Sequence, residues 1–239
     1  MKKILLALSI SAVMAGAAQA NEWNYSAEHG PAHWGEFSQT CAAGKNQSPI
    51  NISGEVKADL QELNVNYAGK VTALVNNGHT LQAVVEGDNT VTIDGDTFTL
   101  QQFHFHTPSE NLIEDKQFPL EAHFVNADAD GNLTVVAVMF DNGVENEFLT
   151  SLTQTMPKVG ETVTLPKPLE IKDFLPQTDE YYRFNGSLTT PPCSEGVRWF
   201  VLKDVSKLAA SQAEAMMKVM GHNNRPVQNL NARSVMTNN

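Results

Sequence analysis

The chain has 239 residues, a formal net charge of −11 and 41% hydrophobic residues. This length suits one sizeable domain with its own core, because all-β domains commonly reach about 200–250 residues. The acidic balance argues against binding to nucleic acids or anionic membranes, since phosphate groups do not attract a negatively charged protein.

The first 20 residues have the pattern of a secretory signal peptide. Lys2 and Lys3 form a positive start, residues 4–10 begin an apolar stretch, and Ala18-Gln19-Ala20 is a small-x-small cleavage site. The apolar stretch is too short for a membrane span, which needs roughly 20 residues, although a retained membrane anchor is the alternative. We expect cleavage after Ala20, a single catalytic domain over residues 21–239, and a periplasmic or secreted protein.

Short strands separated by turn residues dominate residues 63–140. Apolar segments bounded by Asn, Asp and Gly are typical of strands joined by tight turns. The polar run 127–132 connects the last two predicted strands, which we therefore expect to form an antiparallel pair. The predicted strands are 63–67, 71–75, 80–85, 90–93, 97–106, 120–125 and 133–140.

Helices are few. Residues 145–155 carry apolar side chains at helical spacing, and residues 212–220 form a second predicted helix. In the second helix Ser211 can cap the start, Glu214 completes a capping box and Gly221 ends the helix. The sequence therefore predicts a mainly β fold (β-dominated α+β), a single domain built on a large, mostly antiparallel central sheet with a few peripheral helices.

The two cysteines, Cys41 and Cys193, lie far apart in the sequence. In an oxidising compartment such a pair usually forms a disulfide. Two free buried thiols are the alternative. A cysteine-based metal site is less favoured, because nothing resembles the close C-x-x-C spacing.

The segment Gln102-Phe103-His104-Phe105-His106 is the most informative part of the chain. Residues two apart in a strand share a face. His104 and His106 therefore project together with Gln102 beside them, while Phe103 and Phe105 point into apolar packing on the opposite face.

A second histidine-bearing segment follows at residues 121–125, where Glu121, His123 and Val125 share one face. If the two strands are neighbours, His123 completes a cluster of three imidazoles, which leaves one tetrahedral corner of Zn²⁺ open as in catalytic zinc sites. Gln102 and Glu121 could accept the outer N–H of a ligand histidine. The alternative is that these histidines are scattered on a β surface and bind no metal.

These segments resemble the zinc motif of the alpha carbonic anhydrases. From about Trp23 to Pro226 the chain carries further motifs that match this family in order. They are Gln47–Ile52, Asn76–His79, Gln102–His106, Ser109–Asn111, Glu121–Val125, Gly186–Pro192 and Asn223–Pro226. The resemblance implies a bacterial, exported enzyme that catalyses zinc-dependent, reversible hydration of carbon dioxide to bicarbonate and a proton. In that family zinc-bound hydroxide attacks carbon dioxide held in an apolar pocket.

The same resemblance implies the metal site. The ligands would be His104, His106 and His123, with Glu121 as the hydrogen-bond partner of His123 and Gln102 as that of His104.

The resemblance also implies a hydroxyl relay and a proton path. Thr189 would accept a hydrogen bond from the nucleophile while donating its own to Glu110, and Thr190 would contact bicarbonate. His79 corresponds to the proton shuttle of the family, since an imidazole titrates near neutral pH. Tyr25 resembles a tyrosine that orders the intervening waters. The apolar wall around carbon dioxide is expected from Val125, Val136, Leu188, Val197 and Trp199.

Two other functions are compatible with parts of the sequence. His104-x-His106-x3-Glu110 matches part of the cupin motif for iron or manganese, but the glycines around that motif and the second cupin motif are missing. An exported zinc-binding protein without hydratase activity is the non-enzymatic alternative, although the His-rich loop of many zinc scavengers is absent. The expected partners are carbon dioxide and bicarbonate, with sulfonamide or anion inhibitors; the protein would be a monomer or homodimer.

Overall fold

The computed structural model describes residues 23–238 of the chain. The expected signal peptide and its cleavage site lie outside the described residues, so both remain predictions. Within residues 23–238 no helix combines the length and the apolar character that crossing a membrane requires.

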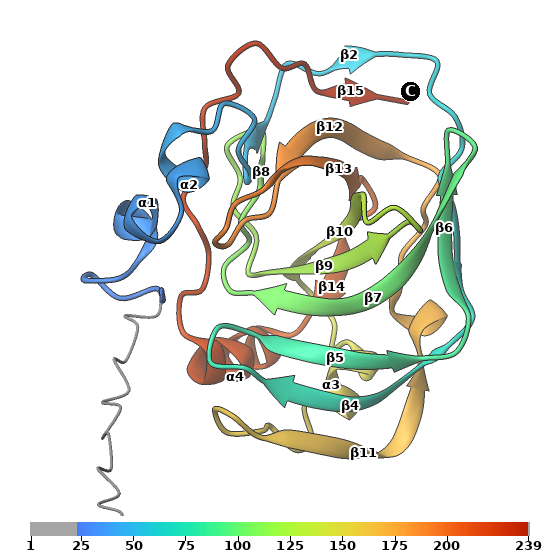
Figure 1. The fold of residues 1–239 in the computed structure, drawn as a ribbon. Helices are drawn as coiled ribbons and strands as arrows, with labels where there is room; N and C mark the ends of the chain where they lie inside the picture. The colour runs from blue at the N-terminus through green and yellow to red at the C-terminus, as the bar shows by residue number, and fades with distance from the viewer. Residues whose placement is uncertain (1–22, 239) are drawn as a thin grey trace, which may run out of the picture.

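One 13-stranded sheet organises the fold (Figure 1). Along most of the sheet neighbouring strands are antiparallel, as predicted, whereas β10 pairs in parallel with β13 and β15 with β2. The strands in spatial order are β11 (Thr162–Glu170), β4 (Lys70–Asn76), β5 (Leu81–Glu86), β7 (Asp96–His106), β9 (Leu120–Ala127), β10 (Leu133–Asn142), β13 (Glu195–Leu202), β12 (Tyr181–Ser187), β15 (Met236–Thr237) and β2 (Val56–Lys57).

Shorter strands lie beside this path. β3 (Asn64–Tyr67) pairs with β6 (Asn89–Ile93), and β14 (Ser206–Leu208) pairs with β10. A separate two-stranded parallel sheet joins β1 (Asn51–Ile52) to β8 (Leu112–Ile113).

The seven strands predicted over residues 63–140 correspond to β3, β4, β5, β6, β7, β9 and β10, with ends shifted by one or two residues. The predicted pairing across the turn 127–132 is confirmed, since Leu133 lies opposite Ala127 in an antiparallel register. No strand was predicted for β12 or β13. In β13 the residues from Trp199 to Leu202 are buried on both faces of the sheet, so the alternating pattern that identifies a half-buried strand is missing.

The helices are few and short, and those nearest the N-terminus lie at one side of the sheet (Figure 1). The short elements η1 (Pro31–His33), α1 (Trp34–Phe37) and α2 (Gln39–Ala43) precede the first strand, and η2 (Ile171–Phe174) follows β11. The first predicted helix is shorter than expected: α3 (Glu147–Leu152) begins after Asn146, whose side chain accepts from the Leu149 N–H at 3.0 Å.

The second predicted helix is α4 (Ala210–Met220), which ends at Gly221 as expected. The predicted Ser211 cap and its capping box with Glu214 are wrong, because the helix begins earlier and Ala209 is the N-cap residue. The Gln212 side chain accepts from the Ala209 N–H at 2.9 Å. It also accepts from the N–H of Asn146 at 2.9 Å and so ties α4 to the start of α3. This long-range contact is not visible in the local sequence.

Each face of the sheet packs on its own hydrophobic cluster. Phe103 and Phe105 belong to a large cluster on one face, together with Phe124 opposite Phe103. The other face carries a smaller cluster that includes Ala137, which lies opposite His123 in the β9–β10 register. Alternation along the strands therefore places the histidines on the face of the smaller cluster.

Candidate active site

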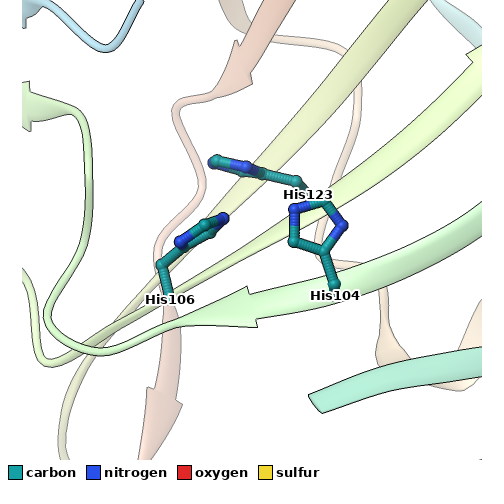
Figure 2. A group of neighbouring side chains, drawn as sticks. All are labelled: His104, His106 and His123. Atoms are coloured by element: carbon teal, nitrogen blue, oxygen red, sulfur yellow. The ribbon is translucent and has the colours of Figure 1, made fainter. Parts of the chain in front are cut away.

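Two neighbouring strands bring the three predicted ligands together (Figure 2). β7 and β9 pair antiparallel with His104 directly opposite His123, and His106 lies two residues further along β7. One nitrogen from each ring falls within a group whose atoms all lie within 4.8 Å of one another. Directly opposed residues in a sheet share a face, so the register alone forces this convergence.

Each ring has a polar group beside its other nitrogen, and two of these contacts are hydrogen bonds. His104 Nδ1 lies 2.9 Å from Gln102 Oε1, and His106 Nδ1 lies 2.8 Å from the carbonyl oxygen of Asn223. His123 Nε2 lies 2.9 Å from Glu121 Oε1. These contacts leave Nε2 of His104, Nε2 of His106 and Nδ1 of His123 to face one another.

The facing nitrogens suit a metal ion. His106 Nε2 is buried and has no hydrogen-bond partner within the described residues. Burial lowers the pKa of His104, His106 and His123, so the rings favour the neutral form that coordinates metals. A buried nitrogen without a partner is costly in the protein alone, and a bound cation would satisfy it.

Glu121 is a buried carboxylate held on several sides. Its Oε2 accepts from the N–H groups of Glu110 and Asn111 at 2.7 and 2.9 Å, and Asn111 Nδ2 donates to Oε1 at 2.8 Å. Burial raises its pKa, and the hydrogen bonds from Asn111 oppose that shift. These hydrogen bonds fix the position of the Glu121 carboxylate. The fixed carboxylate can in turn orient the His123 ring.

Glu110 and Thr189 lie together beside the histidines. Thr189 lies near enough to Glu110 to help lower the pKa of its carboxyl group, and Glu110 Oε1 accepts from the Arg225 N–H at 2.8 Å. Glu110 Oε2 lies 3.4 Å from His106 Nε2 and 3.9 Å from His123 Nδ1. Burial raises the pKa of Glu110 well above its usual range, whereas the Arg225 N–H and Thr189 oppose the shift.

The apolar wall differs from the prediction at one position. Val125, Leu188, Val197 and Trp199 all contribute to the smaller cluster on the face of the histidines. Val136 does not, because it lies opposite Phe124 and packs in the large cluster on the other face.

Val135 is the residue that faces the site. It is buried in the smaller cluster, opposite Val125 on β9 and Trp199 on β13. The error in the sequence analysis is a shift of one residue, which in a strand moves a side chain to the opposite face. The Trp199 ring meets the His123 ring edge-on with centroids 4.9 Å apart.

A pocket of about 190 Å³ opens beside the ligands. It is lined by Trp23, Tyr25, Asn77, His79, Thr80, Gln82, Gln102, His104, His106 and Thr190. The predicted residues His79, Tyr25 and Thr190 thus share one pocket with two of the ligands.

Trp23 is a pocket residue that the sequence analysis did not identify. Its ring stacks on that of His79, with centroids 3.8 Å apart and an interplanar angle of 14°. Tyr25 packs edge-on against the same tryptophan. Desolvation raises the pKa of Tyr25, and the nearby Glu110 carboxylate adds to that shift, so its hydroxyl keeps its proton.

The expected disulfide is present. Cys41 and Cys193 are bonded with an S–S distance of 2.07 Å and a Cα–Cα distance of 5.1 Å. The backbone carbonyls of both cysteines accept hydrogen bonds of 3.0 Å, from Arg225 Nη2 to Cys41 and from Gln47 Nε2 to Cys193. Arg225 Nη1 also donates to Gln47 Oε1 at 2.9 Å. The disulfide is therefore connected to the residue that holds Glu110.

Comparisons with known proteins agree with this geometry. The family model for eukaryotic-type carbonic anhydrase matches residues 29–239. A carbonic anhydrase of Pectobacterium carotovorum is 46% identical over 240 residues, which covers 98% of both chains. A solved Photobacterium profundum alpha-carbonic anhydrase superposes with a TM-score of 0.88 at 56% identity, over 90% of this chain and 100% of that one. Thermovibrio ammonificans alpha-carbonic anhydrase, solved with the inhibitor sulfanilamide, gives a TM-score of 0.87 at 48% identity, over 90% of this chain and 98% of that one.

Proposed function

Because this chain belongs to the alpha carbonic anhydrase family, and so hydrates carbon dioxide reversibly to bicarbonate and a proton, we propose that zinc is its metal and that His104, His106 and His123 hold it. The observation that carries the assignment is the convergence of three imidazole nitrogens within 4.8 Å. Three neutral nitrogen donors with an open fourth position are the typical ligand set of a catalytic zinc ion. A cupin-like iron site or a zinc-storage site is not favoured.

When bound, zinc lowers the pKa of a coordinated water to about 7, a value for which carbonic anhydrases are themselves the standard example. The protein contributes the orientation of the ligands. Gln102 and the Asn223 carbonyl hydrogen-bond the outer nitrogens of His104 and His106, which fixes the tautomer and the angle of these rings. The Glu121 carboxylate lies 2.9 Å from the outer nitrogen of His123 and can do the same for that ring.

Thr189 orients the nucleophile in this proposal. A hydroxyl has one proton to donate, and we propose that Thr189 donates it to Glu110, whose pKa it helps to lower. Its oxygen would then be free to accept a hydrogen bond from a hydroxide held beside the histidines, and this would orient that hydroxide toward carbon dioxide. Such fixed orientation lowers the entropic part of the barrier.

The apolar wall holds the substrate weakly. Carbon dioxide has no net charge, so Val125, Val135, Leu188, Val197 and Trp199 can pack around it without binding the charged product. Thr190 lines the pocket beside His104 and His106, and in this proposal it contacts bicarbonate.

His79 carries the released proton outward in this proposal. It lines the same pocket as His104 and His106, and an imidazole can both accept and release a proton near neutral pH. Tyr25, in the same pocket, keeps its hydroxyl proton and can order the solvent between them.

The N-terminal pattern and the disulfide support export to the periplasm or beyond the cell. Sulfonamides are expected to bind, as sulfanilamide does in the Thermovibrio ammonificans relative. N-terminal sequencing of protein isolated from the periplasmic fraction would test the cut after Ala20.

Metal content and stopped-flow hydration of carbon dioxide, measured on the same purified sample, test the central proposal. We expect one zinc ion per chain and activity that disappears with a chelator and returns with zinc. Activity that survives complete metal removal, or a chain that retains iron in place of zinc, would contradict it.

A further inference from the structure

Asn223 joins the strand that carries two metal ligands to the turn that carries the proposed proton shuttle. Its backbone carbonyl accepts from His106 Nδ1 at 2.8 Å. Its side-chain Nδ2 donates to the carbonyl oxygens of His79 at 3.1 Å and Phe105 at 2.9 Å. One residue therefore contacts both ends of the proposed proton path.

The rest of the Asn223 amide is also engaged. The Thr107 N–H donates to Asn223 Oδ1 at 2.8 Å, and the Asn223 N–H donates to the Thr107 carbonyl at 3.2 Å. Asn223 is fully buried, so water cannot readily replace these bonds. The loop after α4 thus continues the pairing of β7 beyond His106.

The turn that carries His79 is shaped by hydrogen bonds within the turn and is linked to the rest of the protein by hydrogen bonds from Thr80 and Asn223. The side-chain oxygen of Asn77 accepts from the N–H groups of His79 and Thr80, both at 2.9 Å, and these bonds shape the turn itself. Thr80 Oγ1 attaches the turn to β7 through the Phe105 carbonyl at 2.6 Å. Asn223 attaches the turn at His79 itself, while sharing the same Phe105 carbonyl.

We infer that Asn223 is a positioning residue for proton release: its side-chain amide sets where His79 stands relative to His104 and His106. This inference rests on the proposed shuttle role of His79. Transfer through ordered solvent depends on geometry, and a displacement of about 1 Å can cost on the order of 10²-fold in rate. The backbone carbonyl that holds His106 does not depend on the side chain, so the metal site and the proton path can be separated by mutation.

The test compares Asn223→Ser and Asn223→Ala with His79→Ala, by stopped-flow hydration of carbon dioxide with turnover expressed per bound metal ion. For both Asn223 variants we expect kcat in dilute buffer to fall about tenfold, part of the roughly 10²-fold that a positioned acid–base group supplies. Added imidazole should restore kcat, and kcat/KM should stay at the wild-type value. Two variants are used so that the result does not depend on one of them folding.

Asn89→Ala is the matched control. Asn89 is also a buried asparagine whose side chain hydrogen-bonds backbone groups, those of Gly69, Glu86 and Gly87, and none of these belongs to the His79 turn or to the loop of Asn223. This variant should keep the wild-type kcat in dilute buffer.

The outcomes separate the inference from the shuttle proposal. A loss restored by imidazole in His79→Ala and in the Asn223 variants supports both. The same loss in His79→Ala alone would overturn the role of Asn223 and leave the shuttle standing. If His79→Ala keeps the wild-type kcat in dilute buffer, both the shuttle proposal and the role of Asn223 are overturned. A fall in kcat/KM that imidazole does not restore in the Asn223 variants would assign Asn223 to the metal site and overturn the inference.

Discussion

His104 and His123 lie directly opposite each other on the antiparallel strands β7 and β9, and this register decides the site. A slip of one residue in either strand would turn its histidines toward the large hydrophobic cluster on the other face. The metal site is therefore as stable as the pairing of two strands that are buried in the centre of the sheet.

His104→Ala should lose the metal ion and turnover together, since two imidazoles cannot hold zinc with an open fourth position. Metal content and hydration rate measured on the same sample check this. His222→Ala is the matched control, because His222 is exposed and lies outside the ligand cluster. A His104→Ala protein that keeps one zinc per chain would contradict the ligand assignment.

Thr189→Ala should lower kcat/KM on the order of 10²-fold, the usual cost of removing one positioned polar contact in an active site. The metal content should not change, because Thr189 contacts Glu110 and no ligand histidine is among the partners described above. Thr189→Ser keeps the hydroxyl and should retain most of the rate. Equal values of kcat/KM in the alanine variant and the wild type would contradict the proposed hydroxyl relay.

Val135→Ala and Val136→Ala form a matched pair that tests which valine faces carbon dioxide. Both side chains are buried, so each change should cost about 1–3 kcal/mol in the free energy of unfolding. Only Val135→Ala should also lower kcat/KM, by about tenfold, which is the low end of the effect of lost methyl groups in an apolar pocket. A larger kinetic effect at Val136 would reverse our assignment.

Reduction of the Cys41–Cys193 disulfide should lower activity before the metal is lost. Thr189 and Thr190 closely precede Cys193, and Arg225 binds the Cys41 carbonyl while its own N–H holds Glu110. The bond should also stabilise the fold by about 3–5 kcal/mol in the chain-entropy model. A Cys41→Ser/Cys193→Ser double variant should match the thiol-treated wild type and should not respond to thiol. Loss of metal in step with activity would assign the effect to unfolding.

Low pH should weaken the surface ion pair between Arg183 and Asp94. Hydrogen bonds from Arg183 lower the pKa of Asp94, so the folded protein favours the ionised carboxylate more than the unfolded chain does. The contribution is present above the unfolded pKa of about 3.9 and is lost as the pH falls through the lower folded value. Because the pair is partly exposed, we expect under about 1 kcal/mol.

Asp94→Asn tests this link, since asparagine tolerates the positive φ of 56° at this position. The difference in unfolding free energy between wild type and variant should be largest near neutral pH and should vanish in acid. A difference in unfolding free energy that grows as the pH falls would contradict the predicted contribution of the ionised Asp94 carboxylate.

The sequence alone determined the features that depend on local periodicity. Alternation along β7 and β9 placed His104 and His106 on one face and Phe103 and Phe105 on the other, because side chains in a strand repeat every two residues. The same rule put Gln102 beside His104 and Glu121 beside His123, where the structure has their polar contacts.

Only the tertiary structure decided the contacts between segments distant in sequence. The carbonyl that holds His106 and the amide that reaches His79 both belong to Asn223, more than a hundred residues further along the chain. Val135 faces the site in place of Val136 because the register of three strands sets which face each residue occupies. Local pattern predicts which residues share a face, whereas long-range hydrogen bonds and strand register determine what that face meets.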